Sequence, residues 1–259
     1  MDLGIRGRKA IVCGASRGLG KACAFALARE GADITIVARH RDTLATTAHE
    51  IAAETGVAVT PVAADVTTPD GRTAIFAACP APDILVNNAD GKLPGDFRDW
   101  TREDWIDALD TMMLCHIEMM RQAVDGMMAR GFGRIVNIVS RSVKIPQAEL
   151  GLSNGARSGL VGFVAGLARQ TVSRNVTINN LLPGIFDSNA QREHVAAMVQ
   201  ERGQTFDELW RARAEANPAG RYGRPDELGD YCAFLCSHNA GYIAGQNLVM
   251  DGGSYPGTY

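Results

Sequence analysis

The feature that most constrains the fold of this chain is an alternation of short apolar runs with longer segments of helical periodicity. The apolar runs occupy residues 9–15, 33–38, 57–64, 83–89, 134–140, 176–184 and 246–250. The helical patterns between them cover residues 18–31, 41–55, 69–79, 101–130, 152–173 and 225–237. Strands that alternate with helices form parallel sheets covered on both faces, so we expect each run to be a buried strand. The pattern predicts an α/β fold of the doubly wound, Rossmann type, with a seven-stranded parallel sheet.

The chain shows no internal division. Neither a linker rich in Pro, Gly or Ser nor an internal repeat interrupts it, so we expect one domain over residues 1–259. Residues 186–217 break the alternation with two short helix-like patterns, at 190–203 and 205–216. We expect this segment to form a lid over the ligand crevice of such a fold. The alternative is a helical hairpin that only packs on the surface.

Composition excludes several kinds of partner. The net charge is -3 and no block of like charges occurs, so we expect binding to neither nucleic acid nor an anionic membrane. The first residues lack the apolar core of a secretory signal, and no segment has the roughly 18 apolar residues of a membrane span, which predicts a cytoplasmic protein. The six cysteines have no CxxC spacing and no nearby histidine ligand, so we expect reduced, structural thiols and no metal site.

A glycine-rich stretch, "CGASRGLGKA", follows the first apolar run and opens the first helical pattern. Gly14, Gly18 and Gly20 permit a tight turn and a close approach of the backbone to a ligand. The free N–H groups at the start of a helix then favour an anion such as the diphosphate of a dinucleotide. Such turns also occur where nothing binds, so it is the position at the first strand–helix junction that favours a cofactor site.

The end of the second apolar run predicts which cofactor is preferred. In dinucleotide-binding folds an acidic residue at this place accepts hydrogen bonds from the 2′-hydroxyl of the adenosine ribose. This chain has Ala38 and Arg39 instead, and Arg17 lies within the glycine turn. Two guanidinium groups that converge on a 2′-phosphate favour NADP(H) over NAD(H). The alternative is that both arginines are merely solvated.

Motifs along nearly the whole chain resemble the short-chain dehydrogenase/reductase family. "GASRGLG" is similar to its cofactor turn, "NNAD" to its NNAG motif, "RIVNIVS" to its serine-bearing strand and "LLPGIFDS" to its PG segment, and the stretch from "GRYGRP" to "VMDGG" resembles its C-terminal signature. The resemblance implies an oxidoreductase that commonly assembles as a homotetramer or dimer and acts on a small-molecule substrate.

The same resemblance extends the set of cofactor-binding candidates. It implies contacts to the adenine at residues 65–66, to the ribose at 88–89 and to the nicotinamide at 183–185, with Ser188 at the nicotinamide carboxamide. The candidates from the turn, the arginines and the resemblance are Gly14, Ser16, Arg17, Gly18, Leu19, Gly20, Arg39, Asp65, Val66, Asn88, Ala89, Arg157, Pro183, Gly184, Ile185 and Ser188.

The catalytic positions depart from the family pattern, which uses an Asn, a Ser, and a Tyr and a Lys four residues apart. Ser140 matches the serine. The family's usual interval then places Ser153 at the tyrosine position and Arg157 at the lysine position. The asparagine position falls on Met112, and Asp90 replaces the last glycine of NNAG. The resemblance therefore implies an atypical active site that includes Ser140, Ser153, Arg157 and Asp90.

The replacement of the tyrosine affects proton transfer most. A phenol with a reference pKa of about 10, lowered by a neighbouring cation, can protonate a forming alkoxide, whereas a serine hydroxyl is shorter and far less acidic. Arg157 can bond the nicotinamide ribose, but a guanidinium does not release its proton in proteins. We therefore expect cofactor binding with impaired proton transfer, and the loss of a general acid typically slows a reaction about 10²- to 10⁴-fold.

Several groups remain open as the proton source. Asp90 is one, although a turn or capping role is the alternative for it. Lys92, Arg141 and Lys144 lie in nearby loops, where a solvated position is the alternative. A water held by Ser153 and Arg157 is another source, because the missing ring leaves polar space.

Three functions follow from these observations. The favoured one is NADP(H)-dependent hydride transfer to or from a small or aromatic carbonyl or alcohol, with Ser140 as an oxyanion donor. An imine or enone substrate would make the missing tyrosine less harmful, and Arg157 could instead clamp a substrate carboxylate. The alternatives are lyase or isomerase chemistry around a fixed cofactor, and a non-enzymatic NADP(H)-binding sensor.

Overall fold

Seven parallel strands form the central sheet in the order β3-β2-β1-β4-β5-β6-β7. The strands are β1 (Lys9–Cys13), β2 (Asp33–Ala38), β3 (Val59–Ala63), β4 (Ile84–Asn87), β5 (Gly133–Ile138), β6 (Val176–Pro183) and β7 (Asn247–Met250). All six neighbouring pairs are parallel, which confirms the doubly wound α/β fold. The computed structural model describes residues 1–258, without the side chains of residues 200–202, so residue 259 of the predicted domain lies outside the description.

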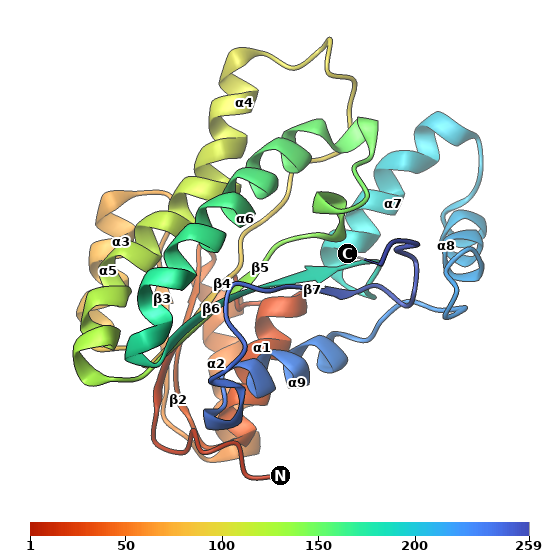
Figure 1. Ribbon diagram of the computed structural model, residues 1–259. Coiled ribbons are helices and arrows are strands. Elements are labelled where there is room, and N and C mark those ends of the chain that lie inside the picture. Colours follow the sequence, from red (N-terminus) through yellow and green to blue (C-terminus); the bar gives the residue numbers. More distant parts are fainter. Residues whose placement is uncertain (259) are drawn as a thin grey trace.

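Helices cover both faces of this sheet (Figure 1). The helices are α1 (Gly18–Arg29), α2 (Arg41–Thr55), α3 (Pro69–Ala78), α4 (Arg102–Leu109), α5 (Cys115–Arg130), α6 (Gly151–Thr171), α7 (Asn189–Arg202), α8 (Phe206–Glu215) and α9 (Pro225–Leu235). One core cluster lies under α1, α2 and α9, and the other under α3, α5 and α6. Because successive strand residues point to opposite faces, Ile11 and Val12 of β1 enter different clusters.

The two outer strands are less buried than the sequence predicts. The sequence predicts a buried strand at residues 57–64, yet β3 has two half-buried and three exposed residues. The prediction is wrong here because β3 pairs only with β2 and forms an edge of the sheet. An edge strand also tolerates Pro61, which lacks the N–H that an inner strand needs. At the opposite edge, β7 is half-buried throughout.

The predicted continuous helix over residues 101–130 consists of three parts. Between α4 and α5, Asp110–Leu114 forms a π-helical segment, which shifts the register of the side chains that follow. Met112 of this segment is fully buried and packs with Ala108, Leu152 and Ala156. Met112 therefore places its thioether in the core beside α6.

A ladder of four asparagines, three of them buried, crosses the neighbouring strands β4, β5, β6 and β7. Asn87 Nδ2 donates to Asn137 Oδ1 at 2.9 Å, and Asn137 Nδ2 donates to Asn180 Oδ1 at 2.9 Å. Asn180 Nδ2 in turn donates to Asn247 Oδ1 at 2.8 Å. Each of these residues lies opposite the next in the strand register. The ladder therefore fixes the alignment of β4 to β7.

Helices α7 and α8 form the two elements predicted within residues 186–217. They share a small apolar cluster made by Val195, Met198 and Leu209. Trp210 of α8 stacks on Tyr222 with ring centroids 3.9 Å apart, which attaches the pair to the segment before α9. In Figure 1 the pair lies beside the sheet, apart from the helices that cover its faces. No helix of residues 1–258 combines the length and the apolar character that crossing a bilayer requires.

Candidate active site

The glycine turn lies at the carboxyl end of β1, where the strand order reverses between β1 and β4. Ligands of doubly wound folds bind at such a point. Gly14 and Gly18 have φ angles of +59° and +58°, which disfavour any other residue. A Cβ on Gly20 would lie 2.2 Å from the Gly14 carbonyl oxygen. Asn88, just after β4, donates from Nδ2 to that same oxygen at 3.2 Å and fixes the turn.

The first turn of α1 leaves its amide groups available to a ligand. Arg17 occupies the N-cap position, and no side chain caps the helix. The turn is tied to α2 because Thr47 Oγ1 donates to the Ser16 carbonyl oxygen at 3.0 Å. Uncapped N–H groups at a helix start attract anions, so the turn has the geometry of a diphosphate site. Ser16, Gly18 and Leu19 all line cavities at this turn.

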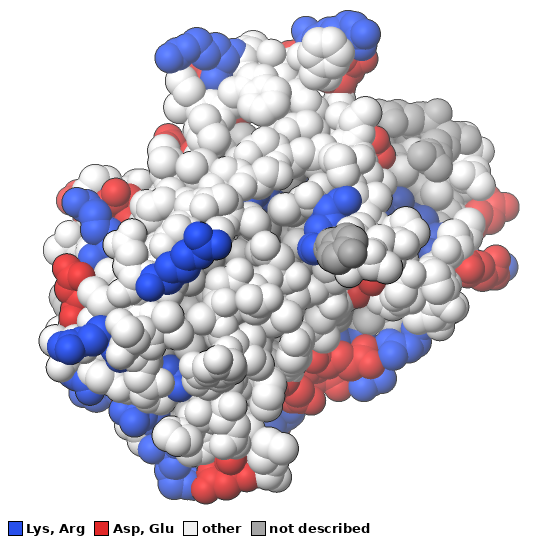
Figure 2. Space-filling view, in the orientation of Figure 1, with Lys and Arg blue, Asp and Glu red and all other residues white. Residues whose placement is uncertain are grey.

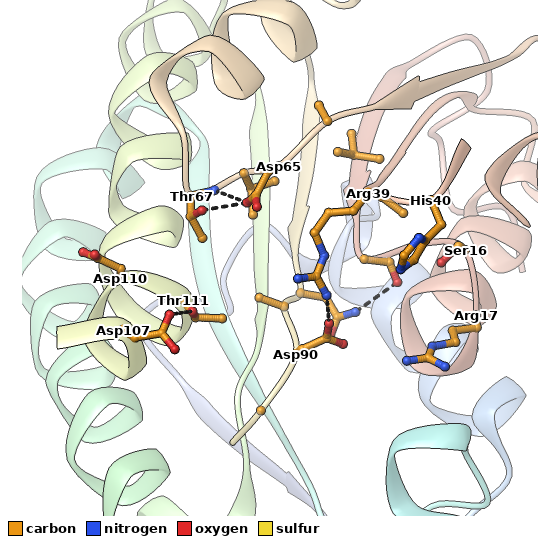
Figure 3. Close-up of a pocket in the computed structure, with 18 of the residues that line it drawn as sticks. Ser16, Arg17, Arg39, His40, Asp65, Thr67, Asp90, Asp107, Asp110 and Thr111 are labelled. Carbon is orange, nitrogen blue, oxygen red and sulfur yellow. Dashed lines mark hydrogen bonds and ion pairs between the residues drawn. The ribbon is translucent and has the colours of Figure 1, made fainter. Parts of the chain in front are cut away.

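A cavity of about 410 Å³ lies between the ends of β2 and β4 (Figure 3). It brings together the predicted adenosine-binding residues, namely Arg39, Asp65, Val66, Asn88 and Ala89. Asp65 accepts hydrogen bonds from Thr67 N at 2.9 Å and Thr67 Oγ1 at 2.7 Å. Partial burial opposes ionisation of Asp65, but the Thr67 hydrogen bonds and nearby Arg39 lower its pKa overall. Asp65 is therefore a fixed carboxylate at the floor of the cavity.

The two arginines predicted to converge on a phosphate point to different carboxylates. Arg39 pairs with Asp90, and Arg17 Nη1 lies 3.1 Å from Glu193 Oε1 on α7. Figure 3 shows the Arg39 side chain directed to Asp90 and Arg17 lying apart from it. Both pairs are about half-exposed or more, and such pairs contribute about 0–1 kcal/mol. Arg17 and Arg39 therefore do not converge on one point, as the sequence analysis expected. Because both ion pairs are weak, a bound phosphate can replace either carboxylate as the partner of its arginine.

A larger cavity of about 760 Å³ continues from the glycine turn towards α7 and α8. It brings together Ser140, Ser153 and Arg157 with the nicotinamide-side candidates Pro183, Gly184, Ile185 and Ser188. On α6, Ser153 and Arg157 are only 8% and 6% exposed. Arg157 Nε donates to Ser153 Oγ at 3.1 Å, and Nη1 donates to the Ile138 carbonyl oxygen at 3.2 Å. The structure thus pairs Ser153 and Arg157 directly.

The Arg157 guanidinium is a buried cation. Burial lowers its pKa to about 10, and Cys115 opposes this shift, so the group stays charged at neutral pH. No carboxylate of the described residues forms an ion pair with it. A Cβ placed on Gly91 would lie 3.8 Å from Nη2, so that nitrogen faces the segment after β4. Arg157 therefore presents donors towards the cavity without a neutralising partner.

Behind Arg157 lies a buried histidine that the sequence analysis did not single out. His116 Nδ1 is 3.3 Å from Cys115 Sγ, and its Nε2 is buried without a hydrogen-bond partner. Burial lowers the pKa of His116 to about 3, and Arg157 adds to this shift. The ring is therefore neutral at physiological pH. Its position one helical turn after Met112 is the only sequence signal that could have drawn attention to it.

The hydroxyl groups of Ser140 and Ser188 each accept one backbone hydrogen bond. Ser140 Oγ accepts from Ser142 N at 3.1 Å, and Ser188 Oγ caps α7 by accepting from Gln191 N at 3.3 Å. A hydroxyl that accepts one hydrogen bond keeps its own proton for donation. Both groups can therefore still donate to a ligand in the cavity.

The other proposed proton sources have partners in the structure. Asp90 is paired with Arg39, and Lys92 is paired with Asp107. Arg141 donates to Ser254 Oγ, and Lys144 Nζ lies 5.3 Å from the centroid of the Tyr255 ring. None of these four contacts involves Ser140 or Ser153, so the role of each in proton transfer stays a prediction.

Helices α7 and α8 add polar residues to the large cavity that the sequence analysis missed. They are Gln191, His194 and Arg213, and Gln147 lies across from them before α6. The expected lid position of residues 186–217 and the helical spacing of Gln191 and His194 could have indicated that pair, whereas no spacing relates Arg213 or Gln147 to them. All six cysteines are free and buried, and the described residues hold no cluster of three or more metal-ligating side chains.

The sheet order, the glycine turn and the cavity at the switch point define a doubly wound protein with a nucleotide-type site. The chain belongs to the short-chain dehydrogenase/reductase family, because the family model described as enoyl-(acyl carrier protein) reductase matches residues 14–255. It is 32% identical to the 3-oxoacyl-[acyl-carrier-protein] reductase FabG of Vibrio cholerae, over 98% of this chain and 99% of that protein. This match covers the whole arrangement described above.

Two further relatives are named for their coenzyme. The NADPH-dependent reductase BacG of Bacillus subtilis is 30% identical over 95% of this chain and 97% of its own length. The structure of L-sorbose reductase from Gluconobacter frateurii, complexed with NADPH and L-sorbose, superposes with a TM-score of 0.93 at 30% identity. It covers 99% of this chain and 100% of that one. The relatives are oxidoreductases, which favours that class over the lyase and sensor alternatives.

Proposed function

We propose that the protein is an NADP(H)-dependent oxidoreductase that transfers hydride between the nicotinamide and a carbonyl or alcohol substrate, with related imines or enones as further acceptors. One observation carries the proposal: the two cavities form a continuous crevice from Arg39 to Arg157. Both are lined by Gly14, Arg17 and Asn88, so a single extended ligand can occupy them. The coenzymes named for the relatives support this assignment.

The residues present fit an NADP(H) molecule. The glycine turn has no room for a Cβ on Gly20, as expected where backbone amides must reach a diphosphate. We assign the adenine to Asp65 and Val66, the 2′-phosphate to Arg39, the nicotinamide ribose to Arg157 and the carboxamide to Ser188. When bound, the coenzyme supplies or accepts the hydride, and every other contribution comes from the chain.

In this proposal Ser140 stabilises the substrate oxygen. Its hydroxyl keeps a proton for donation, because the bond from Ser142 N uses only a lone pair. A donor fixed in this way is oriented before negative charge develops on the oxygen, so little reorganisation is needed during the reaction. Met112, at the position where the family pattern has an asparagine, offers no second hydrogen-bond donor to the substrate oxygen, because its side chain is buried in apolar surroundings.

The proton reaches the substrate oxygen through Ser153, directly or through one water in the cavity. Because Ser153 Oγ accepts from Arg157 Nε, its own hydrogen is free to point elsewhere. The adjacent guanidinium favours negative charge on the hydroxyl oxygen and so makes it a better proton donor. A serine remains a weak acid, so this route is slower than a phenol route.

The first test is direct. Purified protein should bind NADPH in calorimetry and should oxidise it in the presence of a panel of ketones, imines and enones. Ser140→Ala should lower kcat by about 10²-fold, as for loss of one oxyanion donor, with little change in NADPH affinity. Ser158→Ala is the matched control, because Ser158 is exposed on α6. Product formation without NADPH oxidation would contradict hydride transfer.

The second test restores the family pattern. Ser153→Tyr with Arg157→Lys should raise turnover of a simple ketone such as ethyl 3-oxobutyrate by about 10²-fold, since it supplies a general acid. Ser153→Ala with Arg157→Lys is the control, and it should not raise turnover. If the tyrosine variant binds NADPH normally and shows no gain, proton transfer is not the step that limits the natural site.

A further inference from the structure

Three side chains able to carry positive charge line the large cavity on its β5–α8 side. They are Arg141 after β5, His194 on α7 and Arg213 on α8. Arg141 lies next to the nicotinamide-side segment, since a Cβ on Gly184 would lie 3.5 Å from Arg141 Cδ. Ser140 is its neighbour in sequence. The three groups therefore surround the part of the cavity where a substrate of the proposed reaction must sit.

Neither guanidinium has a carboxylate partner among the described residues. Arg141 donates to the neutral Ser254 hydroxyl, and the Arg213 Nη1 atom lies 3.6 Å from Met198 Sδ. Arg213 Nε is buried without a hydrogen-bond partner, and so is Gln191 Nε2 in the same cavity. Arg17 and Lys92, which also line this cavity, are both ion-paired. Arg157 is unpaired as well within the described part of the chain, but it is held by its bonds to Ser153 and to the Ile138 carbonyl oxygen. Unsatisfied buried donors in native structures call for an explanation, and a bound acceptor provides one.

The positive groups also act on one another. Burial lowers the pKa of Arg141, Arg213 adds to this shift, and Asp251 opposes it. Burial likewise lowers the pKa of His194, with Arg213 adding and Glu149 opposing. At neutral pH the lowered pKa leaves His194 uncharged, so the repulsion is between Arg141 and Arg213. An anion bound between these two guanidinium groups relieves that repulsion. On the outer face in Figure 2, by contrast, both signs of charge lie intermixed around the rim.

The coenzyme does not supply the anion that would bind between Arg141 and Arg213. In the proposed function its phosphates lie at the start of α1 and at Arg39, on the other side of the crevice. Its nicotinamide end carries no anionic group, and the oxidised ring is itself a cation. The anion must therefore come from the substrate.

We propose that the substrate carries a carboxylate, which Arg141 and Arg213 bind while Ser140 holds the carbonyl oxygen. Gln191 Nε2 supplies a further donor to the same group. The forked arrangement of guanidinium donors matches a planar carboxylate, and such charge-assisted bonds are roughly twice as strong as neutral ones. The position given to the substrate carbonyl rests on the proposed function. The carboxylate site is inferred only from the contacts of Arg141, Arg213 and Gln191.

A binding measurement tests the carboxylate site without requiring turnover. Protein saturated with NADP+ is titrated calorimetrically with 4-oxopentanoate and benzoylformate, and with the methyl ester of each. We expect each free acid to bind at least about tenfold more tightly than its ester, as a charge-assisted hydrogen bond implies. Arg213→Gln should abolish this preference. Arg211→Gln, an exposed arginine on the same helix, is the matched control and should keep it.

The outcomes separate the two proposals. Equal binding of acid and ester, or equal losses in Arg213→Gln and Arg211→Gln, overturns the carboxylate site. A variant Arg213→Gln that weakens acid and ester alike also overturns it, because that result indicates a structural role for Arg213. If NADPH is oxidised by the esters as readily as by the acids, the reductase function stands and this inference fails. If the acids bind selectively but no carbonyl compound is reduced, the reductase function fails and this inference stands.

Discussion

At the scale of single residues, Gly20 shows how closely the cofactor turn is packed. A Cβ on Gly20 would lie 2.2 Å from the Gly14 oxygen and 2.9 Å from Asn88 Nδ2. We predict that Gly20→Ala lowers the free energy of unfolding by about 1–3 kcal/mol, the usual penalty of overpacking, and weakens NADPH binding by at least tenfold. Chemical denaturation and calorimetric titration measure the two effects.

Gly162→Ala is the matched control for this change. Gly162 lies within α6, and a Cβ there meets nothing within 4 Å. The same substitution should therefore raise the free energy of unfolding by roughly 0.5–1 kcal/mol through helix propensity alone. If both variants were equally stable and bound NADPH equally well, the close packing of the turn would not matter for function.

His116 predicts a pH dependence of stability. Its pKa is about 3 in the folded protein and 6.5 in the reference state, so below about pH 6.5 the unfolded chain gains a proton that the folded chain does not. Stability from this group is complete above that pH and is lost as the pH falls. Between about pH 7.5 and about pH 5 the loss should be about 2 kcal/mol, measured by denaturant unfolding.

His116→Gln isolates this contribution, because glutamine cannot take up a proton in this range. The slope of stability against pH should become shallower in this variant. His49→Gln should keep the slope of the natural protein, since His49 is exposed on α2. An unchanged slope in His116→Gln would mean that the buried ring is not the group that resists protonation.

Residue types alone indicated much of the candidate site, but not its pairings. Gly14 and Gly20 follow from local sequence, because a turn between a strand and a helix needs small residues. Asn88 follows from the resemblance of the NNAD motif to that of the family. The Arg39–Asp90 and Arg17–Glu193 pairs could not be predicted, since they depend on how β4 and α7 approach the turn. The same holds for Arg213, which lines the cavity because α8 packs against α7.

At the scale of elements, the asparagine ladder fixes strand register where the site is built. Asn137 sits at its centre and bonds both Asn87 and Asn180. Asn137→Leu would leave two buried amide atoms, Asn87 Nδ2 and Asn180 Oδ1, without their partners, each at a penalty of about 1–3 kcal/mol. We predict a loss of about 2–4 kcal/mol in the free energy of unfolding.

The control for the ladder is Asn239→Ala. Asn239 is exposed and makes a single bond to the Asp2 carbonyl oxygen. Its replacement should change the free energy of unfolding by less than about 0.5 kcal/mol, with both variants measured by urea titration. Comparable losses in the two variants would show that the ladder contributes no more than a surface hydrogen bond.

Element order could be predicted because buried strands and amphipathic helices differ in period and length. The edge exposure of β3 could not, because an apolar run does not record how many neighbours its strand has. The π-helical segment at Asp110–Leu114 was also missed, since the segments on both sides of it are helical and neither Gly nor Pro marks it in the sequence. The displaced residues matter for the site, because this segment packs on α6 beside Ser153 and Arg157.

At the scale of the whole molecule, the crevice contains positive charge although the chain as a whole has a net charge of -3. Arg39, Arg157 and Arg213 mark three places along it, at the proposed 2′-phosphate, the nicotinamide ribose and the substrate carboxylate. A ligand that binds only the folded state adds stability by mass action. Coenzyme binding should therefore be visible in global unfolding.

We predict that NADPH at a hundred times its Kd raises the free energy of unfolding by about 2.7 kcal/mol, and that NADH at the same concentration gives a smaller increase. Arg39→Ala should remove most of this difference, because it removes the proposed partner of the 2′-phosphate. Asp90→Asn should enlarge it, since the carboxylate that competes for Arg39 is lost. Arg29→Ala is the control, as Arg29 pairs with Glu54 outside the crevice. Thermal scans with each coenzyme measure these shifts, and equal shifts for NADPH and NADH in the natural protein would contradict the assignment of Arg39.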